Sequence, residues 1–284
     1  MADRAVTGSL PGGAHVGGDR PASLADPAAA GLSCTATGSG PAVLWLHGYT
    51  MDSSLWDELW SALPGFRHIG VDLPGHGASP APAPGATLPQ IAAQVARIAR
   101  AQRAHRVVAL SFGSLVALQL AIDAPDLVAR LALGAATIGG TPASAEIRRR
   151  YAELAMLHRI AGPGEALADR WMTSPPDIFR GTEEHPHLRA RIHDVVLRHR
   201  WTELAHGGLR ALNAHRQDAA ALRGIRADTL ILLGSRDMPA YHANTATLCR
   251  ELPRCRAETL PGAGHLCLLE QPAAAAALLA DHLH

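Results

Sequence analysis

The sequence predicts an α/β fold: a doubly wound, mostly parallel sheet with a helical lid inserted after the sixth strand. Three observations favour this fold. Short apolar segments alternate with segments of helical length at both ends of the chain. Between them lies a block with helical signal and no strand signal. Several polar residues follow directly after predicted strands, where ligands bind in open parallel sheets.

The composition describes a well-cored protein without a basic excess. Of its 284 residues, 48% are hydrophobic and 18% charged, and the formal net charge is +1. This length allows one sizeable domain with an insertion, or two small domains. The near-neutral charge argues against a nucleic-acid partner. No apolar run is long enough to span a bilayer, so we expect no membrane partner.

The ends of the chain and its cysteines indicate the compartment. The first residues lack the apolar core of a signal peptide, and the four cysteines form no Cys-x-x-Cys pair. These features favour a reduced, cytoplasmic protein. Residues 1–30 are rich in Gly, Ala, Pro and Asp without periodicity, which predicts a poorly ordered tail.

The core of the predicted fold comprises residues 31–136 and 223–284. Apolar, β-branched runs predict strands at 32–37, 42–47, 67–71, 107–110 and 127–134 in the first part, and at 229–233 and 257–260 in the second. Helices are expected between them at 53–63, 88–103, 115–122, 240–251 and 272–283. Strands that alternate with helices in this way imply a parallel sheet.

Residues 137–222 are the predicted lid. Helical runs occur at 143–160, 164–173, 186–200 and 202–217. An insertion of helices between two strands of one sheet has to lie outside the sheet. We therefore expect this segment to cover the site at the strand ends.

The stretch around Ser111 predicts a sharp turn from strand to helix. A serine at this corner has its hydroxyl pushed out above the sheet edge, at the positive end of the following helix. The motif is Ala109-x-Ser111-x-Gly113, with alanine where glycine is more usual, and alanine is small enough to fit. The alternative is an ordinary strand–turn–helix with Ser111 as the helix N-cap.

Two further polar residues follow later strands. Asp237 comes just beyond the strand at 229–233, and His265 lies in a glycine-rich loop after the strand at 257–260. A serine nucleophile needs a base to take its proton, and the base needs an acid to orient it. Alone, Asp237 could be a turn residue and His265 a structural histidine. With Ser111, in the order Ser, Asp, His, they predict a catalytic triad.

These motifs together resemble the α/β-hydrolase superfamily, in its lidded branch of esterases, lactonases and carbon–carbon bond hydrolases. The resemblance spans about residues 32–284, and the segments that carry it are His47-Gly48, Asp72-Leu-Pro-Gly-His-Gly-Ala-Ser79, Ser111 with Gly113, Gly234-Ser-Arg-Asp237, and Gly264-His265 followed by Glu270-Gln-Pro272. It implies the α/β-hydrolase fold, with Ser111 as nucleophile, His265 as base and Asp237 as orienting acid.

The resemblance also implies the surroundings of the triad. It places an oxyanion hole at the backbone N–H groups of Tyr49 and Phe112. It assigns His47 and His76 to structural turns that support the oxyanion loop. Asp72 is more consistent with bracing this loop than with acid chemistry.

We therefore expect a serine hydrolase that cleaves an ester, lactone or thioester of a medium-sized, mainly apolar small molecule through an acyl-enzyme. The sequence has no Gly-rich phosphate loop and no dinucleotide fingerprint, so no cofactor is expected. The lid should wall the substrate pocket, or its large side chains could instead form its own core. The candidates are Ile138, Tyr151, Met156, Trp171, Met172, Phe179 and Trp201.

Other interpretations remain open. The same fold and triad can serve non-hydrolytic or C–C bond chemistry in secondary metabolism, such as cyclisation, perhydrolysis or C–C hydrolysis. A non-catalytic ligand-binding module would keep the fold without turnover. A metal site at His185, His187 and His193 lacks helical i, i+4 spacing, so no metal is expected. The run Arg148-Arg-Arg150 predicts a solvated helix face or, alternatively, an arginine that binds a substrate carboxylate.

Overall fold

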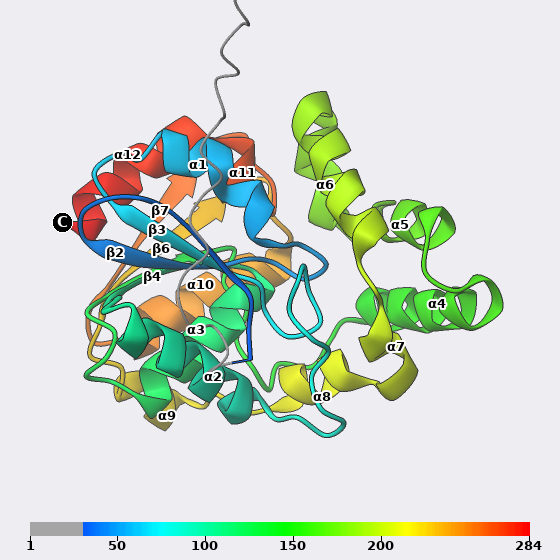
Figure 1. The fold of residues 1–284 in the computed structure, drawn as a ribbon, viewed down its shortest axis with the longest axis horizontal. Helices are drawn as coiled ribbons and strands as arrows, with labels where there is room; N and C mark the ends of the chain where they lie inside the picture. The colour runs from blue at the N-terminus through cyan, green and yellow to red at the C-terminus, as the bar shows by residue number, and fades with distance from the viewer. Residues whose placement is uncertain (1–30) are drawn as a thin grey trace, which may run out of the picture.

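The computed structural model describes residues 31–284, and the predicted tail at 1–30 lies outside the described residues. Within them, strands form one seven-stranded sheet in the order β1-β3-β2-β4-β5-β6-β7 (Figure 1). The strands are β1 (Cys34–Gly38), β2 (Ala42–Leu46), β3 (Arg67–Val71), β4 (Arg106–Leu110), β5 (Arg130–Gly134), β6 (Asp228–Gly234) and β7 (Cys255–Leu260).

The sheet is parallel except at one edge. Strand β1 pairs antiparallel with β3, and every other neighbouring pair is parallel. The central strands are buried almost throughout, and all five residues of β2 are buried. Continuous apolar strands suit a parallel sheet whose two faces are both covered by helices. The mostly parallel α/β fold that the sequence predicts is confirmed.

Two groups of helices cover the two faces of this sheet (Figure 1). One group consists of the 3₁₀ helix η2 (Ser53–Trp56), α1 (Asp57–Ser61), α11 (Cys267–Glu270) and α12 (Pro272–Leu283). The other consists of α2 (Leu88–Ala101), α3 (Phe112–Asp123), α9 (Ala219–Arg223) and α10 (Pro239–Glu251). Helix α3 is the central one, and its residues from Phe112 to Ala121 are all buried.

A separate group of helices lies between β5 and β6 in the chain. It comprises α4 (Ala145–Ala161), α5 (Glu165–Trp171), η3 (Asp177–Glu184), α6 (Pro186–Arg198), α7 (Thr202–His206) and α8 (Gly208–Ala214). Figure 1 shows α4 to α7 set to one side of the sheet, and we call α4 to α8 the lid helices. The prediction that they follow the sixth strand is wrong, because only five strands precede them in the described residues.

Short helices account for several of the other differences from the predicted elements, and the strands expected at 32–37 and 127–134 are β1 (Cys34–Gly38) and β5 (Arg130–Gly134). The single helix expected over 202–217 is two, α7 and α8, because Gly207 between them has a left-handed φ of 63°. The 3₁₀ helix η3 and the four-residue α11 were not predicted, since neither is long enough to show a helical hydrophobic period. No helix within residues 31–284 is both long and apolar enough to cross a membrane.

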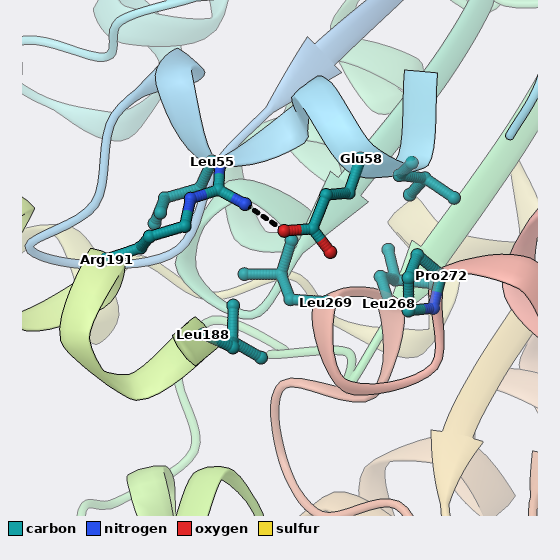
Figure 2. Close-up of a pocket in the computed structure, with 8 residues that line it drawn as sticks. Leu55, Glu58, Leu188, Arg191, Leu268, Leu269 and Pro272 are labelled. Atoms are coloured by element: carbon teal, nitrogen blue, oxygen red, sulfur yellow. Dashed lines mark hydrogen bonds and ion pairs between the residues drawn. The ribbon is translucent and has the colours of Figure 1, made fainter. Parts of the chain in front are cut away.

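The lid helix α6 packs against the core through both apolar and charged side chains. Figure 2 shows a shallow depression here, where Leu188 of α6 faces Leu55, Leu268 and Leu269. At its rim the Arg191 guanidinium pairs with the carboxylates of Glu58 and Asp57 at the start of α1. This depression contains none of the three predicted triad residues.

Candidate active site

Ser111 occupies the corner between β4 and α3. Its backbone has φ 50° and ψ −113°, a region that costs a non-glycine residue roughly 1–3 kcal/mol. The surrounding structure holds it there. The Ser111 N–H donates to the carbonyl of Gly134 on β5 at 2.9 Å, and the helix that follows is buried on every side. A strained serine held at a strand end has its hydroxyl exposed for chemistry.

Close approach of backbones explains the small residues beside Ser111. A Cβ on Gly113 would overlap the carbonyl oxygen of Leu46 and lie 2.7 Å from that of His47. Helix α3 can therefore start this close to the end of β2 only with glycine at this position. Ala109 lies fully buried in β4, and the turn forms with alanine in the place where glycine is usual.

The structure brings the three predicted triad side chains together. The Ser111 Oγ lies 2.8 Å from His265 Nε2. On the other side of the ring, His265 Nδ1 lies 3.0 Å from Asp237 Oδ1 and 3.2 Å from Oδ2. His265 is 1% exposed and Asp237 7%. A neutral imidazole that donates from Nδ1 to a carboxylate leaves Nε2 free to accept the serine proton, which is how serine hydrolases activate a hydroxyl.

The loop that carries His265 is held by a buried carboxylate. Glu270 accepts hydrogen bonds from the N–H groups on both sides of the histidine, those of Gly264 at 2.5 Å and Leu266 at 3.0 Å. Burial raises the pKa of this carboxyl. A Cβ on Gly234, at the end of β6, would overlap the backbone of Ala263 and Gly264. The motif Glu270-Gln-Pro272 therefore positions the predicted base.

The loop after β2 lies beside the serine. A Cβ on Gly48 would be 3.8 Å from the Cβ of Ser111. His47 braces this loop, because its Nε2 accepts from the Leu73 N–H at 2.9 Å and its Nδ1 lies 2.8 Å from the Gly48 carbonyl. Among residues 31–284, the N–H groups of Tyr49 and Phe112 donate no hydrogen bond to another protein group. Both remain available as donors next to the Ser111 turn.

The loop from Asp72 to Ser79 supports the predicted oxyanion loop. Asp72 accepts from the N–H groups of Ser53 and Ala78, each at 2.9 Å. His76 bonds through Nδ1 to the Pro74 carbonyl, and its buried Nε2 has no partner within the described residues. Burial, with His199 and His47 nearby, holds the pKa of His76 well below its usual value. His76 is therefore neutral, and its ring stacks on that of Phe112.

Aromatic rings from the lid gather on the ring of Tyr49. The rings of Tyr151, Trp171 and Trp201 lie 5.4 to 6.3 Å from it, and the Phe112 ring of the core lies edge-on to it at 6.3 Å. Three of the predicted pocket residues thus converge on Tyr49, in the loop beside Ser111. Of the other candidates, Ile138, Met172 and Phe179 are buried.

Met156 does not belong with the other pocket candidates. Its side chain is 64% exposed. Tyr151 on the same helix faces the aromatic group, and five residues turn an α-helix by about 140°. Met156 therefore points away from the site, and we correct the prediction that it lines the pocket.

Three polar residues at the site were missed from the sequence. Tyr241 of α10 packs its ring on the His265 ring at 4.2 Å, and burial, with Asp237 nearby, raises its pKa to about 12. Glu203 and His199 of the lid form a hydrogen-bonded pair beside Tyr49. None of the three belongs to a motif, and only the fold brings them to Tyr49 and His265.

His193 and Arg150, which the sequence singles out, have structural partners. His193 pairs with Asp169 on the lid surface, and no group of three His, Cys, Asp or Glu in residues 31–284 could hold a metal ion. Arg150 is not on the solvated face that the sequence predicts, because it is 3% exposed. Its guanidinium donates to the carbonyls of Arg170 and Thr173 at 2.9 and 2.7 Å and so braces the lid.

Comparison with known proteins agrees with this architecture. The model of the alpha/beta hydrolase family matches residues 43–278. A pimeloyl-[acyl-carrier protein] methyl ester esterase from Nitrosomonas europaea is 28% identical over 86% of this chain and 96% of its own length. A putative 2-succinyl-6-hydroxy-2,4-cyclohexadiene-1-carboxylate synthase from Bacillus subtilis is also 28% identical, over 81% of this chain and 86% of its own.

Solved structures are similar over most of the chain. A thermophilic esterase from Thermogutta terrifontis superimposes with a TM-score of 0.73 at 26% identity, covering 89% of this chain and 92% of its own. Most of the length of the two chains therefore shares one architecture. The chain belongs to the alpha/beta hydrolase family and is an enzyme of the hydrolase class.

Proposed function

We propose that this enzyme hydrolyses a carboxylic ester, lactone or thioester through an acyl-enzyme on Ser111. One observation carries the proposal: an unbroken hydrogen-bonded path runs from Ser111 Oγ through the His265 ring to Asp237. The names of its relatives, which include several esterases, support the same reaction class.

In this mechanism Ser111 attacks the carbonyl carbon while His265 Nε2 takes the hydroxyl proton. Asp237 keeps the imidazole in the tautomer that can accept this proton and stabilises the imidazolium that forms. The N–H groups of Tyr49 and Phe112 donate to the oxyanion, and one such donor typically contributes about 3–4 kcal/mol. His265 then protonates the leaving group. In the second half, the same ring deprotonates a water that releases the acid and frees the serine.

We propose a medium-sized, mainly apolar small molecule as substrate. The aromatic rings of Tyr151, Trp171 and Trp201 beside Tyr49 support an apolar acyl or alcohol group under the lid. One polar group adds to this class. The Tyr241 hydroxyl lies beside Ser111, so the site also offers a hydrogen-bonding group to the substrate.

The experiment compares the enzyme with Ser111→Ala on p-nitrophenyl esters of two to eight carbons. We expect a loss of kcat of about 10⁴-fold or more, since a serine nucleophile has no substitute within reach. Ser61→Ala, at an exposed serine of α1, is the matched control and should retain full activity. A fluorophosphonate should label the enzyme at Ser111 and leave Ser111→Ala unlabelled. Turnover that survives in Ser111→Ala would contradict the proposal.

A second candidate is non-hydrolytic or C–C bond chemistry by the same triad. The similarity to the Bacillus subtilis synthase favours it, since that name describes a reaction other than ester hydrolysis. This candidate predicts that the fluorophosphonate labels Ser111 although no ester is turned over. Labelling together with ester turnover favours the hydrolase.

A further inference from the structure

The lid reaches the predicted oxyanion loop through one buried carboxylate. The Tyr49 hydroxyl donates to Glu203 Oε1 of α7 at 2.5 Å, across 154 residues of sequence. His199 Nε2 lies 3.0 Å from the same oxygen. The side chain of Glu203 is 10% exposed and that of His199 1%. Few buried carboxylates occur without such partners, because desolvation disfavours the charge.

The pKa shifts of the two groups make Glu203 the ionised acceptor and Tyr49 the protonated donor. Burial by itself would raise the pKa of the Glu203 carboxyl, but the hydrogen bond and charge of His199, with the Tyr49 hydroxyl, bring it below its usual value. Burial and the Glu203 charge hold the pKa of Tyr49 well above its usual value. The phenol therefore keeps its proton and donates a hydrogen bond to the carboxylate. A hydrogen bond to a charged acceptor is stronger than one between neutral groups.

A second contact ties the same loop to the lid. The Trp171 Nε1–H of α5 donates to Thr50 Oγ1 at 2.8 Å, and this hydroxyl donates to the Tyr49 carbonyl at 2.6 Å. Thr50 has a left-handed φ of 62°, and Trp201, just before α7, has one of 56°. Such conformations are rare for β-branched or bulky residues and persist only where the surroundings hold them.

We propose that Glu203 is a positioning residue for the oxyanion hole, because its carboxylate holds the Tyr49 side chain and so aims the Tyr49 N–H at the oxyanion. The inference rests on the proposed function. Oxyanion donors are effective because they are held in place before charge develops, and a donor on a loop needs support from its neighbours. Here the support comes from the lid, so the lid completes the catalytic site as well as walling the pocket.

The test uses Glu203→Gln and Tyr49→Phe, with Glu153→Gln as the matched lid control. Glu153 is an exposed lid carboxylate paired with Arg170 and has no contact with Tyr49. We expect kcat on a short p-nitrophenyl ester to fall roughly 10-fold in the first two, a part of the 10²–10³ that a complete donor contributes. KM should change less than about twofold, because the oxyanion forms only in the transition state.

Two further readouts separate positioning from a merely structural role. An alkylboronic acid, which mimics the tetrahedral intermediate on Ser111, should bind more weakly by the same factor as kcat falls. The double variant Tyr49→Phe/Glu203→Gln should be no slower than either single variant, since both remove one interaction. Glu153→Gln should match the wild type in every measurement.

The outcomes distinguish this inference from the function on which it rests. Wild-type kcat and boronate affinity in Glu203→Gln and Tyr49→Phe, with turnover still lost in Ser111→Ala, overturn the inference alone. A rise in KM at unchanged kcat also overturns it, in favour of substrate binding. If the wild type shows neither serine-dependent turnover nor fluorophosphonate labelling, the proposed function fails and the inference with it. If Glu203→Gln does not fold, the result for Tyr49→Phe decides whether the inference holds, because this variant removes only a hydroxyl.

Discussion

The core and the lid position their functional side chains in different ways. In the core, Ser111, Asp237 and His265 follow three strands of one sheet, and backbone approaches at Gly113 and Gly234 leave no room for a side chain. In the lid, the residues at the site reach Tyr49 through single side-chain contacts such as that of Glu203. Helix α4 leaves Met156 and Ile160 exposed, at 64% and 76%.

This difference has a physical consequence for function. A close-packed sheet admits few alternative arrangements, so the triad geometry is insensitive to changes elsewhere. A separate layer that meets the core only through side-chain contacts can shift at lower cost, and elements that move or adapt come from such regions. Substrate choice and oxyanion geometry should therefore vary with the lid, whereas the triad should not.

The same substitution at two glycines tests this contrast most strongly. Gly113→Ala should destabilise the protein by about 3 kcal/mol, because the new methyl group meets backbone oxygens that cannot move. At Gly208 in the lid, the nearest atom to a new Cβ is 3.8 Å away, so Gly208→Ala should change stability by less than about 1 kcal/mol. Urea unfolding measures both. Equal losses in the two variants would mean that core and lid are packed alike.

Replacing His76, at the boundary between the two regions, should have a smaller effect on stability, and this effect should depend on pH. The folded-state pKa of His76 lies well below its usual value near 6.5, so below that pH the unfolded chain binds more protons than the folded one. The contribution of neutral His76 is complete above about pH 6.5 and is lost as the pH falls towards the folded-state pKa. A histidine with a lowered pKa changes the free energy of unfolding by up to about 1.4 kcal/mol per pH unit in this range.

The variant His76→Phe should therefore lower the slope of unfolding free energy against pH between about 6.5 and 5 by up to that amount. Phenylalanine keeps the ring next to Phe112 and cannot take up a proton. His187→Gln, at an exposed lid histidine, is the control and should leave the slope unchanged. An unchanged slope in His76→Phe would show that His76 takes up a proton as readily in the folded chain as in the unfolded one, which contradicts the lowered pKa.

Removing the ion pairs that join α6 to α1 should have the smallest effect on stability. Arg191 bonds Glu58 and Asp57 at the surface, where the two carboxylate side chains are 48% and 64% exposed. We expect Arg191→Gln to cost about 0.5–1 kcal/mol, since water and salt screen exposed pairs. Unfolding measured at low salt and at 0.5 M NaCl should show the difference shrink. A loss above about 2 kcal/mol at high salt would mean that the lid is held mainly by charge.

The sequence predicted the core more fully than the lid. The strand at 67–71 is found with the same bounds, and the prediction at 42–47 differs from β2 by one residue, because buried apolar runs bounded by turns have few other conformations. Residues next to these strands could be named from their motifs alone. Met156 and Arg150 were assigned incorrectly, since the pattern of a lid helix does not reveal which of its faces meets the core.

The sequence by itself determined the sheet, its crossing helices and the residues that stand at the strand ends, because local hydrophobic periods and close-packing glycines act within a few residues of the positions they specify. The tertiary structure alone decided that Glu203, His199 and Tyr241 lie at the site. These side chains carry no local pattern, and Glu203 meets Tyr49 across 154 residues of chain. Their positions follow from how the lid packs on the core, which depends on many distant contacts at once.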